Sequence, residues 1–195
     1  MTQANNDSII YLMNDIDLEG RVYNGQIMSG DFSGHFHGNG YTISNFTASG
    51  VFGSIIGTVE NLSIKGNMIG SQRGFLAFHI TGKVQNIFID VTFKKPSQYV
   101  GGLALVVNSS DVSNLIILAR NKETIQVDMV YGACVQRGNL TDVILYKEGS
   151  LNNGGSGINV VSEAQLINRD TYANFDETIW HIVNGEVPYL IKQGE

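Results

Sequence analysis

Short runs in which apolar and polar residues alternate recur along most of the chain, with small or turn-forming residues between them. In GTVENLSIKG, for example, Val59, Leu62 and Ile64 alternate with polar residues that face water, apart from a change of phase at Asn61. A period of two is typical of strands with one buried face, and the phase changes where a strand turns a corner. No segment between these runs has the 3.6-residue period of an amphipathic helix. The pattern therefore predicts an all-β protein of short strands.

The strand pattern itself repeats. Four segments align, beginning VFGSIIG, FLAFHIT, GLALVVN and YGACVQR, and each ends in a strand with Asn or Asp at the same place. These corner residues are spaced by 25, 28 and 28 positions. Such a period is too short for a strand–helix–strand unit but fits one coil of a parallel solenoid. The sequence therefore predicts parallel β-helix coils over residues 1–161.

An asparagine at the same corner of each coil has a clear physical role. Stacked coils lie about 4.8 Å apart, so identical amides can hydrogen-bond to one another along the stack. Asparagine also tolerates the left-handed backbone that a sharp corner requires. We expect a structural ladder formed by Asn45 (in a shorter first copy of the repeat), Asn61, Asn86, Asn114 and Asp142.

The repeat pattern stops before residues 162–195. Ser162 is a candidate N-cap for a short helix, and ETIWHIVNGEVPYLI predicts a hairpin that turns at Asn184-Gly185. An open solenoid exposes apolar core at its ends, so this segment is expected to cap the same domain. Trp180 is the expected plug over the open core.

The motifs resemble those of a known family. The stretches YLMNDIDLEG, FSGHFHGNGYTISNF, VFGSIIGTVENLSI and WHIVNGEVPYLI are similar to GLUG-type repeat proteins of bacteria and phages, over nearly all of the chain. The resemblance implies a right-handed parallel β-helix, in a family of adhesins, surface proteins and phage-related proteins with binding or structural roles. It carries no catalytic residues. One departure is His37, which stands where the family has Asp.

Charge and composition narrow the function classes. The net charge of −6 argues against a nucleic-acid-binding protein and favours a partner with a basic surface. The single cysteine, Cys134, has apolar neighbours and is expected in the core. Neither a membrane-spanning apolar run nor a secretory signal is apparent. We expect a location in a cytoplasm (that of the host, if a phage encodes the protein) or in a virion.

His35 and His37 are the candidate metal ligands. One residue apart on a strand, they project from the same face, but zinc needs further ligands and no other residue has a matching spacing. The glycines of GHFHGNGYT match no phosphate-binding fingerprint, and Gly38-Asn39-Gly40 predicts a tight turn. We therefore expect no metal and no cofactor.

Catalysis is the least favoured function class. Hydrolysis of a polysaccharide requires two acidic groups roughly 5–10 Å apart across a sugar groove. Asp15 and Asp17 share one face but belong to the common repeat motif, and the basic residues are scattered. A polysaccharide-degrading enzyme is thus the third hypothesis, behind two binding functions.

Binding is the function that the sequence favours. A rigid β-helix face can dock on a partner at little entropic cost, and loops between coils carry specificity. The candidate partner-binding residues are His35, His37, Lys94, Lys95, Tyr99, Lys122, Glu123, Lys147 and Glu148. We expect a non-enzymatic binding protein of a phage or other mobile element that docks on a protein partner, for example to inhibit a host defence complex. The alternative is a phage tail component or a glycan-binding adhesin module.

Overall fold

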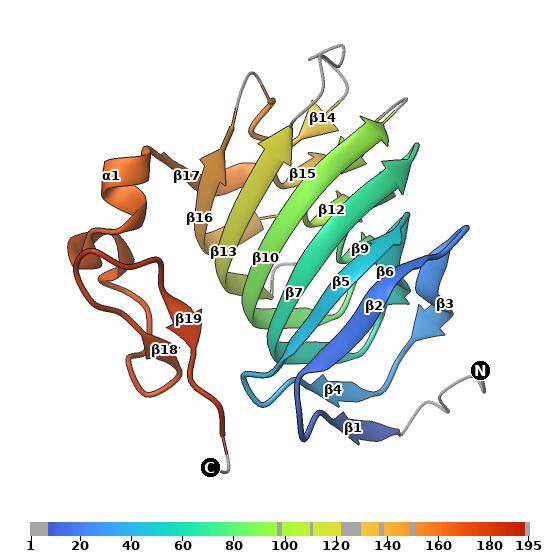
Figure 1. Ribbon diagram of the computed structural model, residues 1–195, viewed down its shortest axis with the longest axis horizontal. Helices are drawn as coiled ribbons and strands as arrows, with labels where there is room; N and C mark the ends of the chain where they lie inside the picture. Colours follow the sequence, from blue (N-terminus) through green and yellow to red (C-terminus); the bar gives the residue numbers. More distant parts are fainter. Residues whose placement is uncertain are drawn as a thin grey trace.

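The chain folds as a parallel β-solenoid (Figure 1). The computed structural model describes residues 8–96, 99–109, 111–121, 130–136, 139–148 and 151–193. Among these residues every strand pair of the solenoid is parallel, and the one antiparallel pair lies in the C-terminal segment. The predicted parallel β-helix is therefore confirmed.

One long sheet runs the length of the stack. Its strands are, in spatial order, β1 (Ile9–Tyr11), β4 (His35–His37), β7 (Thr58–Gly70), β10 (Lys83–Pro96), β13 (Val112–Asn121), β16 (Asn139–Lys147) and β17 (Ser156–Val161). Beside this path, β2 (Ile16–Val22) pairs with β5 (Thr42–Ala48), and β5 pairs with the second half of β7.

Two smaller sheets close the coils. The first contains β3 (Gln26–Phe32), β6 (Gly50–Ile55), β9 (Ala77–Ile80), β12 (Ala104–Val107) and β15 (Cys134–Gln136). The second contains β8 (Arg73–Gly74), β11 (Val100–Gly101) and β14 (Val130–Tyr131). A coil thus runs through β7, β8 and β9, and the next coil begins at β10, beside β7.

The main core fills the space between these sheets. Val59, Leu62 and Ile64 are fully buried, as the alternating pattern predicts. Phe32 and Phe36 are buried at the start of the stack, and Cys134 is buried near its other end.

The C-terminal segment begins where the last coil ends. It contains the helix α1 (Glu163–Leu166), a 3-10 turn η2 (Arg169–Tyr172) and a hairpin of β18 (Trp180–His181) and β19 (Tyr189–Leu190). Ser162 caps the helix as predicted, because its hydroxyl accepts a hydrogen bond from Gln165 N at 3.3 Å. The predicted antiparallel hairpin is also confirmed.

The position of this segment differs from the prediction. Trp180 is fully buried, but it does not cover the open end of the main core. It belongs to a second core between the segment and the outer face of the long sheet, whose sheet members are Phe88, Ile116, Leu118, Ile144 and Val161. The reason is that part of this outer face, formed by Phe88 on β10, Ile116 and Leu118 on β13 and Ile144 on β16, is apolar and requires a cover. The segment is a lateral strap along the stack (Figure 1).

The strap ends at the opposite end of the molecule from where it starts. Gln193 N donates to Asn39 O at 2.9 Å, and Lys192 Nζ lies 3.0 Å from Asp15 Oδ2. These contacts join the last described residues to the first coils, so the strap crosses most of the stack. None of the helices in the described part of the chain has the length and apolar character to cross a membrane.

Candidate binding groove

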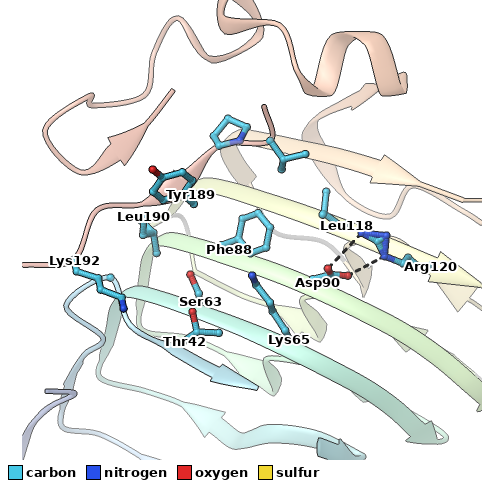
Figure 2. Close-up of a pocket in the computed structure, with 13 residues that line it drawn as sticks. Thr42, Ser63, Lys65, Phe88, Asp90, Leu118, Arg120, Tyr189, Leu190 and Lys192 are labelled. Atoms are coloured by element: carbon cyan, nitrogen blue, oxygen red, sulfur yellow. Dashed lines mark hydrogen bonds and ion pairs between the residues drawn. The ribbon is translucent and has the colours of Figure 1, made fainter. Parts of the chain in front are cut away.

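A groove of about 480 Å³ lies between the strap and the outer face of the long sheet (Figure 2). Its floor comes from β5, β7, β10 and β13, and its wall from residues 187–192 of the strap. We call it the outer groove. Its polar and charged lining residues are Thr42, Ser63, Lys65, Asp90, Arg120 and Lys192.

The strand register explains why these side chains meet. Thr42 pairs with Ser63, and Ser63 with Phe88, so these three form one row across the floor. Lys65 pairs with Asp90 in the next outward row. Neighbouring parallel strands lie about 4.8 Å apart, so side chains in one row are in contact range.

The groove lining contains three cationic side chains, those of Lys65, Arg120 and Lys192, and one carboxylate, that of Asp90. Arg120 donates to both oxygens of Asp90, at 3.0 and 3.3 Å, and also reaches Glu148 at 3.4 Å. Lys65 Nζ lies 5.4 Å from the centre of the Phe88 ring, and Lys192 is paired with Asp15 at the groove's edge. The carboxylates of Asp90, Glu148 and Asp15 thus pair with Arg120 and Lys192, and Lys65 is the groove cation without an ion pair among the described residues.

The serine in this row is not in the environment that the alternating pattern predicts. Ser63 was expected to face water, but it is only 4% exposed because the strap overhangs it. Among the described residues its hydroxyl makes no hydrogen bond, and neither does that of Thr42, whose backbone N–H donates to Asp15. Two hydroxyl groups are thus available to a bound group.

Asp15 connects the groove to the strap. Partial burial raises the pKa of this carboxyl, but the hydrogen bond from Thr42 N at 2.8 Å and the Lys192 ammonium outweigh it, so the net pKa is lowered from 3.8. A lowered pKa in the folded state favours folding at pH values above the unfolded value. This contribution disappears as the pH falls through the folded-state value.

Replacing Asp15 with asparagine should therefore weaken the protein at neutral pH but not in acid. The side chains of Asp15 and Lys192 are 51% and 39% exposed, so water screens the pair and the loss should not exceed about 1 kcal/mol. Urea midpoints of both proteins, measured at neutral pH and at successive values below 3.8, should converge as the pH falls. A constant gap would contradict this.

The two histidines share one carboxylate of β7. His35 Nε2 lies 2.9 Å from Glu60 Oε1, and His37 Nε2 lies 3.4 Å from the same oxygen. His37 also stacks on Tyr11 with ring centres 5.5 Å apart, and its Nδ1 accepts from Asn39 N at 3.3 Å. Within the described ranges, no group of three or more His, Cys, Asp or Glu side chains could hold a metal ion. The contacts of His37 stabilise the corner between the first coils.

The structure joins three of the predicted ladder residues. Asn86 Nδ2 donates to Asn61 Oδ1 at 2.9 Å, and Asn114 Nδ2 donates to Asn86 Oδ1 at 3.3 Å. All three have positive φ, between 52° and 57°. Asp142 continues the same corner opposite Asn114, at φ 52°, but its Oδ1 accepts from Asn174 of the strap at 2.7 Å.

Asn45 lies outside this ladder, so its assignment from the shorter first copy was wrong. Asn45 lies after the corner, between Ser44 and Thr47, where the pairing register of β5 with β7 shifts. Its Nδ2 donates to Asp17 Oδ1 at 2.9 Å. The corner residue of that coil is Asn39, at φ 51°, which donates to Leu12 O at 2.9 Å. The predicted turn at Gly38-Asn39-Gly40 supplies this corner.

The remaining candidate partner-binding residues are dispersed. Lys94 is exposed near the end of β10, and Tyr99 is exposed with φ 40°. Lys147 Nζ donates to Leu151 O at 2.5 Å, and Glu148 reaches the groove only through Arg120. The side chain of Lys95, together with Lys122 and Glu123, lies outside the described residues.

The sequence prediction missed the groove residues, although the repeats contain a signal for them. Two positions after the corner Asn or Asp, the four successive coils have Ser63, Phe88, Ile116 and Ile144. Four positions after it, they have Lys65, Asp90, Leu118 and Tyr146. Both outward positions change from polar to apolar along the stack. That gradient marks where a cover begins, and the groove lies at its edge.

Comparisons with known families, proteins and structures identify no relative of this chain. No family model matches the chain, and neither the search of curated proteins nor that of solved structures finds a match.

Proposed function

We propose that this chain is a non-enzymatic binding protein that docks on a protein partner through the outer groove and the sheet face around it. The observation that carries the proposal is the groove itself, which combines Lys65, a cation without an ion pair among the described residues, with two available hydroxyl groups on a parallel-sheet floor. The sheet face that forms the floor is held by the packed core behind it, so docking on this preformed surface costs little conformational entropy.

The aromatic side chains favour a protein partner over a glycan. Sugar rings stack on exposed aromatic faces, but Phe88 is only 6% exposed and the Lys65 ammonium lies over its ring. Tyr189 is half exposed, yet one of its faces is stacked on His181 with ring centres 4.6 Å apart. The lining therefore suits charged and polar groups of a polypeptide better than a sugar chain.

The acidic side chains favour binding over hydrolysis. Asp90 is the carboxylate in the groove lining, and Arg120 donates to both of its oxygens. A glycosidase requires two carboxyl groups that can exchange a proton with substrate or water. The resemblance to GLUG-type proteins supports a phage or mobile-element origin, and inhibition of a host defence complex is the role that we propose for docking.

Replacing Lys65 with glutamate should abolish partner capture. The tagged protein is expressed in candidate host cells and isolated after cross-linking, and co-purified proteins are quantified by mass spectrometry. A stoichiometric partner of the unaltered chain should be reduced at least tenfold with Lys65→Glu, because a repulsive charge then occupies the groove.

Two matched charge reversals complete this test. Lys83→Glu makes the same change on the same sheet outside the groove and should leave capture unchanged. Lys94→Glu tests the loop surface that the sequence favoured. Loss of the partner with Lys94→Glu but not with Lys65→Glu would show that the partner docks elsewhere, and would refute the groove as the site.

A further inference from the structure

We propose that the outer groove binds the carboxylate of an acidic peptide segment, between the ammonium groups of Lys65 and Lys192 and above the hydroxyls of Thr42 and Ser63. The inference rests on the proposed function, since the peptide would belong to the docked protein. It goes further by naming the chemical group recognised and the four side chains that recognise it.

The hydroxyl groups form the first part of this site. Thr42 and Ser63 are paired neighbours on β5 and β7, so their side chains stand next to each other in the floor. Ser63 is 96% buried, and its hydroxyl has no hydrogen-bond partner in the described part of the chain. Among the described residues Trp180 Nε1 is the one fully buried side-chain N or O without a hydrogen bond, so the Ser63 oxygen is still reachable from the groove, where a bound acceptor would pair with it. In Figure 2 both side chains point into the groove.

The two lysines form the second part, and they come from elements far apart in sequence. Figure 2 shows Thr42 and Ser63 between Lys192, on the strap, and Lys65, on β7. Each ammonium is held over an aromatic ring, Lys65 over Phe88 at 5.4 Å and Lys192 over Tyr41 at 5.3 Å. These contacts orient both charges before any ligand arrives, which reduces the entropic cost of binding.

The ion pairs show which cation is available. Arg120 is engaged by Asp90 and Glu148, and Lys192 by Asp15. Lys65 has no carboxylate within ion-pair distance among the residues that the structure describes. An incoming carboxylate would therefore pair with Lys65 and share Lys192 with Asp15, while the hydroxyls donate to its oxygens.

The surrounding acids select a singly charged group. Asp15 lies beside Lys192, and Asp90 is paired in register with Lys65. A phosphate dianion would be repelled by both carboxylates, and the guanidinium that could clamp it is occupied by Asp90. Lys65 has no carboxylate of the described residues within ion-pair distance, so a singly charged carboxylate matches the one positive charge that is left unpaired.

Fluorescence anisotropy with defined peptides tests the proposal on the full chain. The probe is a labelled, flexible Gly-Ser peptide that carries three spaced glutamates, and its controls carry glutamine or phosphoserine at the same places. We expect the glutamate peptide to bind at least tenfold more tightly than either control, with affinity that falls as salt is raised. Equal binding of the glutamine peptide, or tighter binding of the phosphoserine peptide, would overturn the assignment.

Variants identify the residues. Lys65→Gln should weaken the glutamate peptide about tenfold or more, the usual loss for a charge-assisted hydrogen bond, and Ser63→Ala about fivefold. Lys83→Gln, the matched control outside the groove, should have no effect. Unchanged affinity with both Lys65→Gln and Ser63→Ala would refute the site.

The outcome separates this inference from the proposed function. If Lys65→Glu abolishes capture of the cellular partner but no glutamate peptide binds, docking through the groove stands and carboxylate recognition falls. If the peptide binds through Lys65 while capture of the partner is unaffected by Lys65→Glu, the groove is a carboxylate site but the proposed docking function is refuted.

Discussion

Replacement of Trp180 with alanine is expected to detach the strap from the sheet and to lower the free energy of unfolding by about 3–5 kcal/mol. Trp180 is fully buried in the second core and packs edge-on against Phe175, with ring centres 5.3 Å apart. Its removal would leave a cavity in this second core, to which the outer face of the sheet contributes Ile116 and Ile144. Urea denaturation followed by circular dichroism measures the loss.

Hydrogen exchange shows where the loss occurs. The amide of Ile191 is bonded to Ile179 O within the strap, whereas Ile89 lies in the centre of the long sheet. In Trp180→Ala the amide of Ile191 should exchange much faster, and that of Ile89 should change less, because the strap can open without the coils. Equal acceleration at both amides would mean that strap and coils unfold as one unit.

Phenylalanine at the same position is the matched control. The indole Nε1 of Trp180 is buried and makes no hydrogen bond among the described residues, so the side chain contributes by packing alone. Trp180→Phe keeps most of the apolar contact and removes the unsatisfied donor, which normally costs about 1–3 kcal/mol. It should therefore be far less destabilising than Trp180→Ala, and a similar loss for both would contradict this account.

The coils could be predicted from the sequence because their determinants are local. Alternation places Val59, Leu62 and Ile64 inside, and a left-handed corner favours asparagine at positions 61, 86 and 114. Each of these preferences acts within one strand or one turn, and repetition along the chain makes the pattern readable.

The strap position and the outer groove depend instead on contacts between distant segments. The hairpin could be predicted from Asn184-Gly185, but its docking site depends on which sheet face is apolar, several coils away. Lys65 and Lys192 are brought together by the tertiary fold alone. The misplacement of Asn45 has the same origin, because two extra residues between His37 and Thr42 shift the register there.

Replacement of Asn86 with alanine is expected to cost about 2–4 kcal/mol, from two sources. Asn86 stands in the middle of the ladder, donating to Asn61 and accepting from Asn114, and it is 7% exposed. Its removal leaves both neighbouring amides without this partner. In addition, alanine must adopt φ 52°, which is unfavourable for a residue with a Cβ atom.

Glycine at position 86 separates the two sources. Asn86→Gly also removes the amide but accepts the positive φ, so its loss reports the ladder, about 1–3 kcal/mol. The further loss in Asn86→Ala then reports the backbone strain. If Asn86→Gly lies within about 0.5 kcal/mol of the unaltered protein, a surface-like effect, the ladder contributes nothing and the corner selects asparagine for its backbone alone. A larger loss of stability in Asn86→Gly shows that the amide hydrogen bonds join adjacent coils. They would then also keep β7 and β10, which line the outer groove, in register.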